Sequence, residues 1–167
     1  MNKSFIGKEA EHCLSRWLDH PERGYCFDRI KDQISMYANS SSNICDFTLF
    51  KSPHYYYIEC KATSHDRFDF KQIKGYPDST DVKQQYGGLL MKSKIDNVYG
   101  VVVILFVSQE RAFIIDINEI ERLTKSGQKS LNINDIESSG IRYKEIQKVV
   151  NNRKKYLKFD YVGEFGL

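Results

Sequence analysis

The spacing of apolar residues near the start of the chain predicts an amphipathic helix. Up to Leu18, apolar residues recur at intervals of three and four, which is the repeat of one helical face. Ser4 is a candidate N-cap, and the pair His20-Pro21 should end the helix, because proline disfavours helical backbone in the residue before it. Glu11 lies off the apolar stripe, so the pattern alone leaves it as a solvated helix residue.

Two segments further on have the composition of β-strands. Residues 43–50 and 55–63 are rich in aromatic and β-branched side chains, and the connector between them contains Ser52 and Pro53. We therefore expect a β-hairpin, preceded by a short strand at residues 24–27.

Three charged residues interrupt this apolar hairpin. Asp46 lies in its first strand, and Glu59 and Lys61 lie two positions apart in its second. Because side chains alternate between the two faces of a strand, Glu59 and Lys61 share one face. The other members of that face are Tyr57 and Thr63. The opposite face is expected to belong to the core and consists of Tyr56, Ile58 and Cys60.

The two acidic residues of the hairpin suggest a metal site. A carboxylate is costly to bury without a partner. A divalent cation can offset the repulsion between two carboxylates that converge beside a lysine. The alternative is an ordinary solvated sheet surface. In that case Glu59 and Lys61 form a pair that contributes only a few tenths of a kcal/mol, and Asp46 lies at a strand edge.

The apolar pattern after the hairpin predicts two more strands and a short helix. Residues 100–107 form a continuous apolar run, which is typical of a central strand buried on both faces. Residues 112–116 should pair back onto it. A short helix is expected at residues 119–125, capped by Asn118 and closed by Gly127.

A further helix is expected between the hairpin and the central strand. It should run through Gln84 and Gln85 to Lys94, with its cap among residues 78–81. Gly87 and Gly88 weaken this helix by roughly 1 kcal/mol each. They would also allow a backbone or a ligand to approach closely.

Two segments, residues 64–78 and residues 144–161, combine basic and aromatic side chains. The first is expected to be an ordered loop, and the second is the tail of the chain. Such a mixture is typical of a nucleic-acid surface, in which cations meet phosphates. The alternative is that the rings anchor both segments to the core and the charges form a solvated face. The rings concerned are Phe68, Phe70 and Tyr76 in the loop, and Tyr156, Phe159 and Tyr161 in the tail.

Composition indicates one soluble domain over residues 1–167. Charged residues make up 28% of the chain and hydrophobic residues 41%, and no apolar stretch approaches the roughly 18 residues of a membrane span. The start of the chain does not have the form of a signal peptide, so we expect a cytoplasmic protein with no membrane partner. The net charge of +3 permits a polyanionic partner without requiring one. Four cysteines occur singly in apolar runs and are expected to be small buried residues: Cys13, Cys26, Cys45 and Cys60.

Several segments together resemble the RecU-type Holliday junction resolvases, especially their short phage-borne relatives, within the PD-(D/E)XK nuclease superfamily. Asp46, Glu59 and Lys61 resemble the nuclease signature. No proline directly precedes Asp46, and the span from the first helix to Asp46 is short for the long stalk of RecU proteins. The segments that carry the resemblance are residues 7–11, which include a Gly-x-x-x-Glu pattern, residues 43–47 and 58–63 of the hairpin, residues 100–106 and residues 127–133.

The resemblance implies a restriction-endonuclease-like α/β core, with a mixed central sheet of about five strands flanked by helices. It implies metal-dependent hydrolysis of DNA phosphodiester bonds at four-way junctions, in recombination or repair. A homodimer is expected, because a symmetric junction must be cut twice. The alternatives are a nuclease for other DNA structures and a catalytically silent DNA-binding module on the same fold.

The resemblance also implies roles for individual residues. Mg²⁺ is the expected cofactor, with Mn²⁺ as a substitute, and its expected ligands are the side chains of Asp46, Glu59 and Glu11 and the main-chain carbonyl of Cys60. Lys61 is expected to hold the attacking water or to stabilise developing negative charge. Thr63 is expected to position Lys61 or the phosphate, and Gln85, or its neighbour Gln84, matches a glutamine near the site. The residues expected to contact DNA are Lys8, Arg29, Arg67, Lys71, Lys74, Arg153, Lys154 and Lys155.

Overall fold

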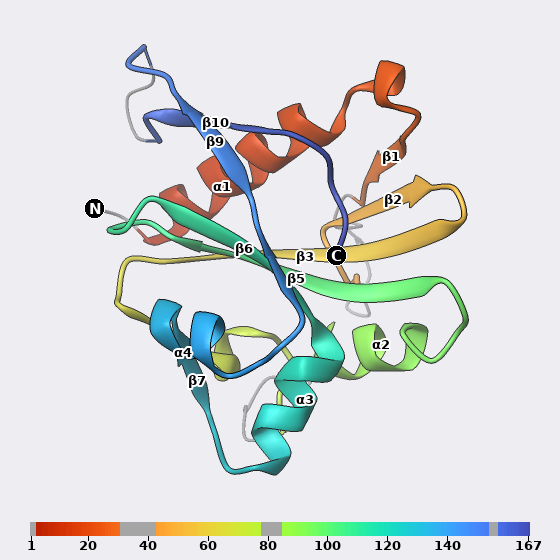
Figure 1. Ribbon diagram of the computed structural model, residues 1–167, viewed down its shortest axis with the longest axis vertical. Helices are drawn as coiled ribbons and strands as arrows, with labels where there is room; N and C mark the ends of the chain where they lie inside the picture. Colours follow the sequence, from red (N-terminus) through yellow and green to blue (C-terminus); the bar gives the residue numbers. More distant parts are fainter. Residues whose placement is uncertain (1–2, 31–42, 78–84, 154–156) are drawn as a thin grey trace, which may run out of the picture.

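The computed structural model describes residues 3–30, 43–77, 85–153 and 157–167 (Figure 1). The main sheet consists of β1 (Cys26–Arg29), β2 (Phe47–Lys51), β3 (His54–Thr63), β5 (Val98–Phe106), β6 (Arg111–Asp116) and β8 (Tyr143–Glu145). These six strands lie in the order β1-β2-β3-β5-β6-β8. β3 and β5 are parallel and all other neighbours are antiparallel, so the sheet is mixed.

Two small sheets and four α-helices make up most of the remaining structure described. β4 (Arg67–Asp69) pairs with β7 (Ser130–Asn132), and β9 (Gln147–Val150) pairs with β10 (Phe159–Val162). The helices are α1 (Lys3–Leu18), α2 (Gln85–Lys92), α3 (Ile117–Lys125) and α4 (Ile133–Ser138), with 3-10 turns η1 (Pro21–Arg23) and η2 (Phe70–Gln72).

The main sheet confirms the α/β fold predicted from the sequence. All five expected strands are present as β1, β2, β3, β5 and β6. The sixth strand, β8, is a three-residue edge strand that pairs with β6. The continuous apolar run lies in β5, between β3 and β6, and residues 101–106 are buried as expected of a central strand.

Helices cover both faces of the sheet, as predicted. α1 lies on one face, and α2 and α3 lie on the other (Figure 1). Leu14 of α1 belongs to the same core cluster as Ile58 of β3. On the opposite face, Leu89 of α2 and Ile120 of α3 belong to a second cluster with Val102 of β5. The sheet is therefore the middle layer of three.

The alternation of side chains along β3 places the charged residues. Tyr56, Ile58 and Cys60 belong to the core cluster on the α1 side, as predicted. Glu59 points to the opposite layer and is 0% exposed. The alternative of a solvated sheet surface is therefore wrong at Glu59.

Several local expectations were wrong. β2 begins at Phe47, so Asp46 lies just before the strand rather than within it. The N-cap of α3 is Asp116, whose side chain accepts a hydrogen bond of 2.9 Å from the backbone N–H of Asn118. Residues 64–78 contain β4 and η2 rather than an unbroken loop.

The aromatic rings of the two basic segments are core residues wherever the structure describes them. The buried rings are Phe68, Phe70 and Tyr76 in the first segment and Phe159 and Tyr161 in the tail. Anchoring to the core, rather than a nucleic-acid surface, therefore accounts for these rings. Tyr156 lies outside the described residues.

The cysteines are buried with one exception. Cys13, Cys45 and Cys60 are buried, whereas Cys26 is exposed on the edge strand β1, which corrects the prediction for that residue. Within the part of the chain that the structure describes, no helix has the length and apolar character needed to cross a membrane.

Candidate active site

Asp46 joins the two strands of the hairpin where their ladder ends. The last paired residues on this side are Phe47 and Ile58. Just beyond them, the backbone N–H of Asp46 donates to the carbonyl of Ile58 at 3.0 Å. The side-chain Oδ2 of Asp46 accepts a hydrogen bond of 2.8 Å from the backbone N–H of Cys60. The carboxylate of Asp46 therefore lies beside the strand segment that carries Glu59.

Glu59 is the most deeply buried acidic side chain in the described part of the chain. Its Oε1 forms an ion pair with the ammonium of Lys61. Its Oε2 is buried and has no hydrogen-bond partner among the described residues. Burial raises the pKa of Glu59 to about 7, although the charge of Lys61 opposes the rise. Because an unsatisfied buried acceptor costs about 1–3 kcal/mol, a bound cation or donor at Oε2 would relieve this site.

Lys61 remains charged although its side chain is only 17% exposed. Burial by itself lowers the pKa of the ammonium. The charge and hydrogen bond of Glu59, together with the charge of Asp46, outweigh burial and raise that pKa above its ordinary value. The site therefore contains a fixed positive charge directed at its carboxylates.

Glu11 of α1 contributes a third carboxylate within electrostatic range. Burial raises the pKa of Glu11, and the charge of Asp46 raises it further, while Arg29 and Lys61 lower it. The guanidinium of Arg29 on β1 donates to Oε2 of Glu11 at 2.8 Å. Glu11 is therefore a partly buried residue of this site rather than a solvated helix residue.

Thr63 and Gln85 are both buried, and their described hydrogen bonds are to backbone groups. The hydroxyl of Thr63 donates to the carbonyl of Arg67 at 3.2 Å and accepts from the backbone N–H of His65 at 3.2 Å. These bonds shape the turn that follows β3. Oε1 of Gln85, the first residue of α2, accepts from the backbone N–H of Lys74 at 3.3 Å. Gln85 thus ties the start of α2 to the segment after η2.

Two of the basic residues expected to contact DNA interact with the acidic site itself. Arg29 is the ion-pair partner of Glu11. Burial raises the pKa of Glu59, and the positive charge of Lys74 is one of the influences that lower this pKa. Arg29 and Lys74 are both exposed, so they lie where the site meets solvent.

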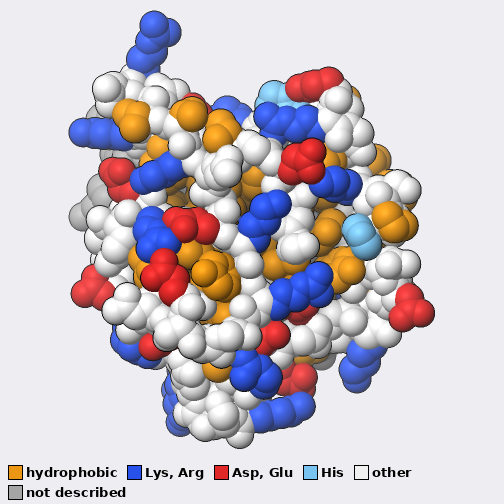
Figure 2. All heavy atoms as spheres, viewed as in Figure 1, with side chains coloured by type: hydrophobic (Ala, Val, Ile, Leu, Met, Phe, Trp, Pro, Cys, Tyr) orange, Lys and Arg blue, Asp and Glu red, His pale blue; other side chains and the backbone are white. Residues whose placement is uncertain are grey.

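The other basic candidates are placed differently. Arg67 is held by Asp135 at 2.9 Å and by the hydroxyl of Ser130 at 3.0 Å, which links β4 to the β7–α4 region. On the face shown in Figure 2, Lys and Arg side chains are interspersed with Asp and Glu. The remaining described candidates are exposed and are Lys8, Lys71 and Arg153. Lys154 and Lys155 lie outside the described residues.

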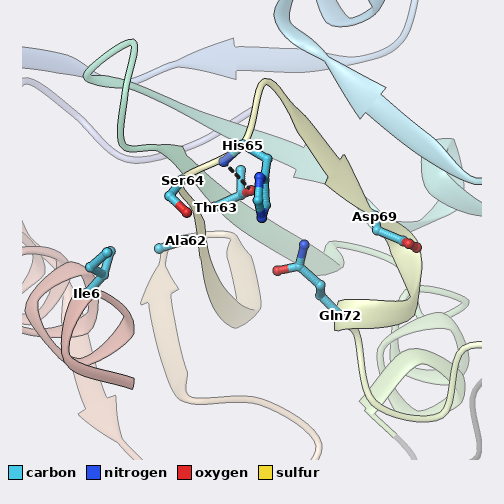
Figure 3. A pocket seen from close by; sticks show the side chains of 7 residues that line it. All are labelled: Ile6, Ala62, Thr63, Ser64, His65, Asp69 and Gln72. Carbon is cyan, nitrogen blue, oxygen red and sulfur yellow. Dashed lines mark hydrogen bonds between the residues drawn. The ribbon is translucent and has the colours of Figure 1, made fainter. Parts of the chain in front are cut away.

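A cavity of about 610 Å³ opens at the end of β3. It is lined by Ile6 of α1, residues 62–65, Asp69 and Gln72 (Figure 3). The sequence prediction did not include Ile6, His65 or Gln72 in the site. The sequence feature that could have indicated these residues is the polar run that directly follows the strand carrying Glu59 and Lys61.

The donor set at Asp46 and Glu59 fits a hard divalent cation. In the described ranges, no group of three or more His, Cys, Asp and Glu side chains is arranged to hold a metal ion. An ion at this pair would therefore take further oxygens from the main chain and water, which is the usual coordination of Mg²⁺. The unsatisfied Oε2 of Glu59 provides one suitable anionic donor.

No family model matches the chain, and no curated protein matches it. Among solved structures, the chain is similar to Hjc of Archaeoglobus fulgidus, described as a Holliday junction resolvase from an archaeal hyperthermophile. The two share 14% sequence identity with a TM-score of 0.49, over 77% of this chain and 89% of that one.

Proposed function

We propose that this chain is a metal-dependent nuclease that hydrolyses phosphodiester bonds in DNA, with branched junctions as its substrates. The observation that carries the proposal is the buried carboxylate of Glu59, which is paired with Lys61 on one oxygen and unsatisfied on the other. Burying such a group lowers stability, and burial of this kind is typical of functional sites. The resemblance of Asp46, Glu59 and Lys61 to the nuclease signature supports phosphodiester hydrolysis as the chemistry of this site.

Asp46, Glu59 and the carbonyl of Cys60 would hold the metal ion. The N–H of Cys60 points to Asp46, and the N–H and C=O of one residue face the same edge of a strand. The carbonyl of Cys60 is therefore on the side of Asp46. Mg²⁺ bound there would lower the pKa of a coordinated water and offset the charge that builds on the phosphate.

The remaining residues of the site would control charge and position. Lys61, kept protonated by the carboxylates, would orient the attacking water or stabilise negative charge on the phosphate. Glu11 would act on the ion directly or through water. Arg29 would keep Glu11 in place through their 2.8 Å ion pair. Lys74, exposed at the rim, would meet a DNA phosphate.

The active form would be a homodimer. A four-way junction has approximate two-fold symmetry and must be cut twice, whereas the described part of the chain provides a single candidate pair of carboxylates for the ion. A closed two-fold dimer supplies both sites in related orientations. Exposed apolar side chains such as Phe50, Met91 and Ile95 leave surface for such an interface. Light scattering at micromolar concentration should give twice the mass of one chain, and one chain's mass would contradict the dimer.

Cleavage of a labelled four-way junction in Mg²⁺ tests the nuclease function. The variants are Asp46→Asn, Glu59→Gln and Lys61→Ala, with Glu121→Gln on α3 as the control. We expect the first three to lose cleavage by at least about 100-fold, since each removes a metal ligand or a charge that acts on the phosphate. The control should cut at the wild-type rate. Wild-type cleavage in all three site variants would contradict the proposal.

Folding must be measured in the same variants. Asp46→Asn and Glu59→Gln relieve repulsion among carboxylates and should unfold at or above the wild-type temperature without metal. Lys61→Ala leaves the buried Glu59 without its ion-pair partner, so we expect it to be less stable at pH 8. Its loss of activity is therefore judged at a temperature at which it remains folded.

A further inference from the structure

The cavity at the end of β3 has the position of a substrate subsite. Ala62 and Thr63, in its wall, directly follow Lys61 along the strand. Two residues of a strand span about 6.6 Å, so the cavity begins next to the carboxylate site. Its volume of about 610 Å³ lies in the range of small-molecule sites, which is roughly 300–1,000 Å³.

The lining of the cavity favours an uncharged, flat and polar-edged group. Ile6 and Ala62 provide apolar wall, while the imidazole of His65 and the amide of Gln72 extend toward each other into the same space (Figure 3). None of the described residues that line the cavity is a lysine or arginine, and its one acidic residue is Asp69. The lining therefore offers no positive charge to a phosphate, so a phosphate is disfavoured there.

We propose that this cavity receives the base of a nucleotide close to the cleaved bond, an inference that rests on the proposed nuclease function. The ring of His65 offers a surface for stacking, as aromatic side chains do for unstacked bases. The amide of Gln72 has both a donor and an acceptor for the polar edge of the base. The carboxylate of Asp69 caps η2 by accepting a hydrogen bond of 2.9 Å from the backbone N–H of Lys71, and it points away from His65 and Gln72 (Figure 3).

The proposal defines the substrate class. A base within duplex DNA is paired and stacked, and extruding it costs a few kcal/mol, with the lowest cost for a base that is already unpaired. The cavity therefore selects DNA that has an unpaired nucleotide beside the cleaved phosphate. Flaps and bulges supply such a nucleotide, and a branch point supplies it when a base pair at the junction opens, whereas uninterrupted duplex does not.

The test compares three forms of one labelled DNA: fully paired, with a single-nucleotide bulge, and with the same bulge lacking its base. Binding is measured by fluorescence anisotropy in EDTA, and cleavage is measured separately in Mg²⁺. Stacking on an aromatic side chain is worth about 1–3 kcal/mol per base, so the wild type should bind the base-containing bulge roughly five- to tenfold or more tighter than the baseless one.

Variants of the lining connect this preference to the cavity. Ser64→Phe would fill the space from an exposed residue, and Gln72→Ala would remove the polar partner of the base. Ser64→Phe should bind the two bulged DNAs equally, and Gln72→Ala should show a smaller preference than the wild type, because the ring of His65 remains. His12→Ala, which removes an exposed histidine of α1 outside the cavity lining, should keep the wild-type preference.

The two proposals fail in different ways. Equal wild-type binding to the base-containing and baseless bulges, or an unchanged preference in both Ser64→Phe and Gln72→Ala, would overturn the base-binding cavity. Absence of Mg²⁺-dependent cleavage of all three DNAs would instead contradict the nuclease function. Equal cleavage of the bulged DNAs with and without the base would agree with the nuclease function and would contradict base binding in the cavity.

Discussion

Oδ2 of Asp46 accepts a hydrogen bond of 2.8 Å from the backbone N–H of Cys60, fourteen positions along the chain. The bond continues the contact between the two arms of the hairpin beyond the last ladder pair, Phe47 and Ile58. It also holds the carboxylate of Asp46 next to Glu59. Asp46 therefore supports the strand and belongs to the candidate metal site, and suitable substitutions should separate these two roles.

Asp46→Asn and Asp46→Ala should differ in stability but not in activity. Asparagine retains a side-chain oxygen that can accept from the N–H of Cys60, whereas alanine leaves this partly buried donor without its partner. We expect Asp46→Ala to lose about 1–3 kcal/mol in urea unfolding without metal, and Asp46→Asn to be at least as stable as the wild type. Both should fail to cut DNA in Mg²⁺. Equal stability of the two variants would contradict the structural role of the bond.

The buried Glu59 should make stability fall as the pH rises. Its pKa is about 7 in the folded protein against an ordinary value of 4.5. Between these values the folded chain keeps a proton that the unfolded chain has lost, so the free energy of unfolding decreases with pH and levels off above about pH 7. The full change is on the order of 3 kcal/mol. Urea unfolding in EDTA from pH 4.5 to 8 measures it.

Glu59→Gln should largely flatten this pH dependence, because glutamine does not titrate. The half-buried Glu11, whose pKa is also raised by burial, should leave a smaller residual slope of the same sign. Glu121→Gln serves as the matched control and should reproduce the wild-type curve. An identical pH dependence in Glu59→Gln would show that Glu59 is not the group responsible.

The central part of the fold could be predicted because its signals are local. The alternation along residues 55–63 identified the two faces of β3, and the continuous apolar run identified β5 as the central strand. A solvated alternative for Glu59 could be rejected only once its burial was known, because spacing does not report depth. Sequence spacing predicted that Glu59 and Lys61 share one face of β3, whereas the burial of Glu59 is visible only in the structure.

The missed features depend on contacts between distant segments. The apolar pattern places Asp46 within its strand, because the single hydrogen bond between its side chain and Cys60 leaves no periodic signal in the sequence. β4 has only three residues and pairs with β7, about sixty positions later. Arg67 is engaged by Asp135, sixty-eight positions away. Patterns of apolar residues carry no information on such pairings.

The adjacent glycines of α2 provide a matched pair of substitutions. A Cβ at Gly87 would meet no atom within 4 Å, whereas a Cβ at Gly88 would lie 2.6 Å from Cγ2 of Ile44. Ile44 lies two residues before Asp46. We therefore expect Gly87→Ala to raise stability by up to about 1 kcal/mol through helix propensity. Gly88→Ala should lower both stability and cleavage, because Ile44 must move and the segment leading to Asp46 moves with it. Equal effects of the two substitutions would contradict the close packing of α2 against this segment.

Lys74 and Arg67 should contribute differently to DNA binding, although both are basic residues of one segment. Lys74 is exposed near Glu59, whereas the guanidinium of Arg67 already binds Asp135 and Ser130. With about six phosphates engaged, affinity should fall roughly 10³-fold between 50 and 200 mM salt. Lys74→Ala should reduce the slope of log affinity against log salt by about 1, which corresponds to one lost phosphate contact. Arg67→Ala removes the same net charge and should leave the slope unchanged, so it controls for charge alone. A flat salt titration of the wild type would contradict phosphate-driven binding, and a wild-type slope in Lys74→Ala would place Lys74 outside the DNA interface.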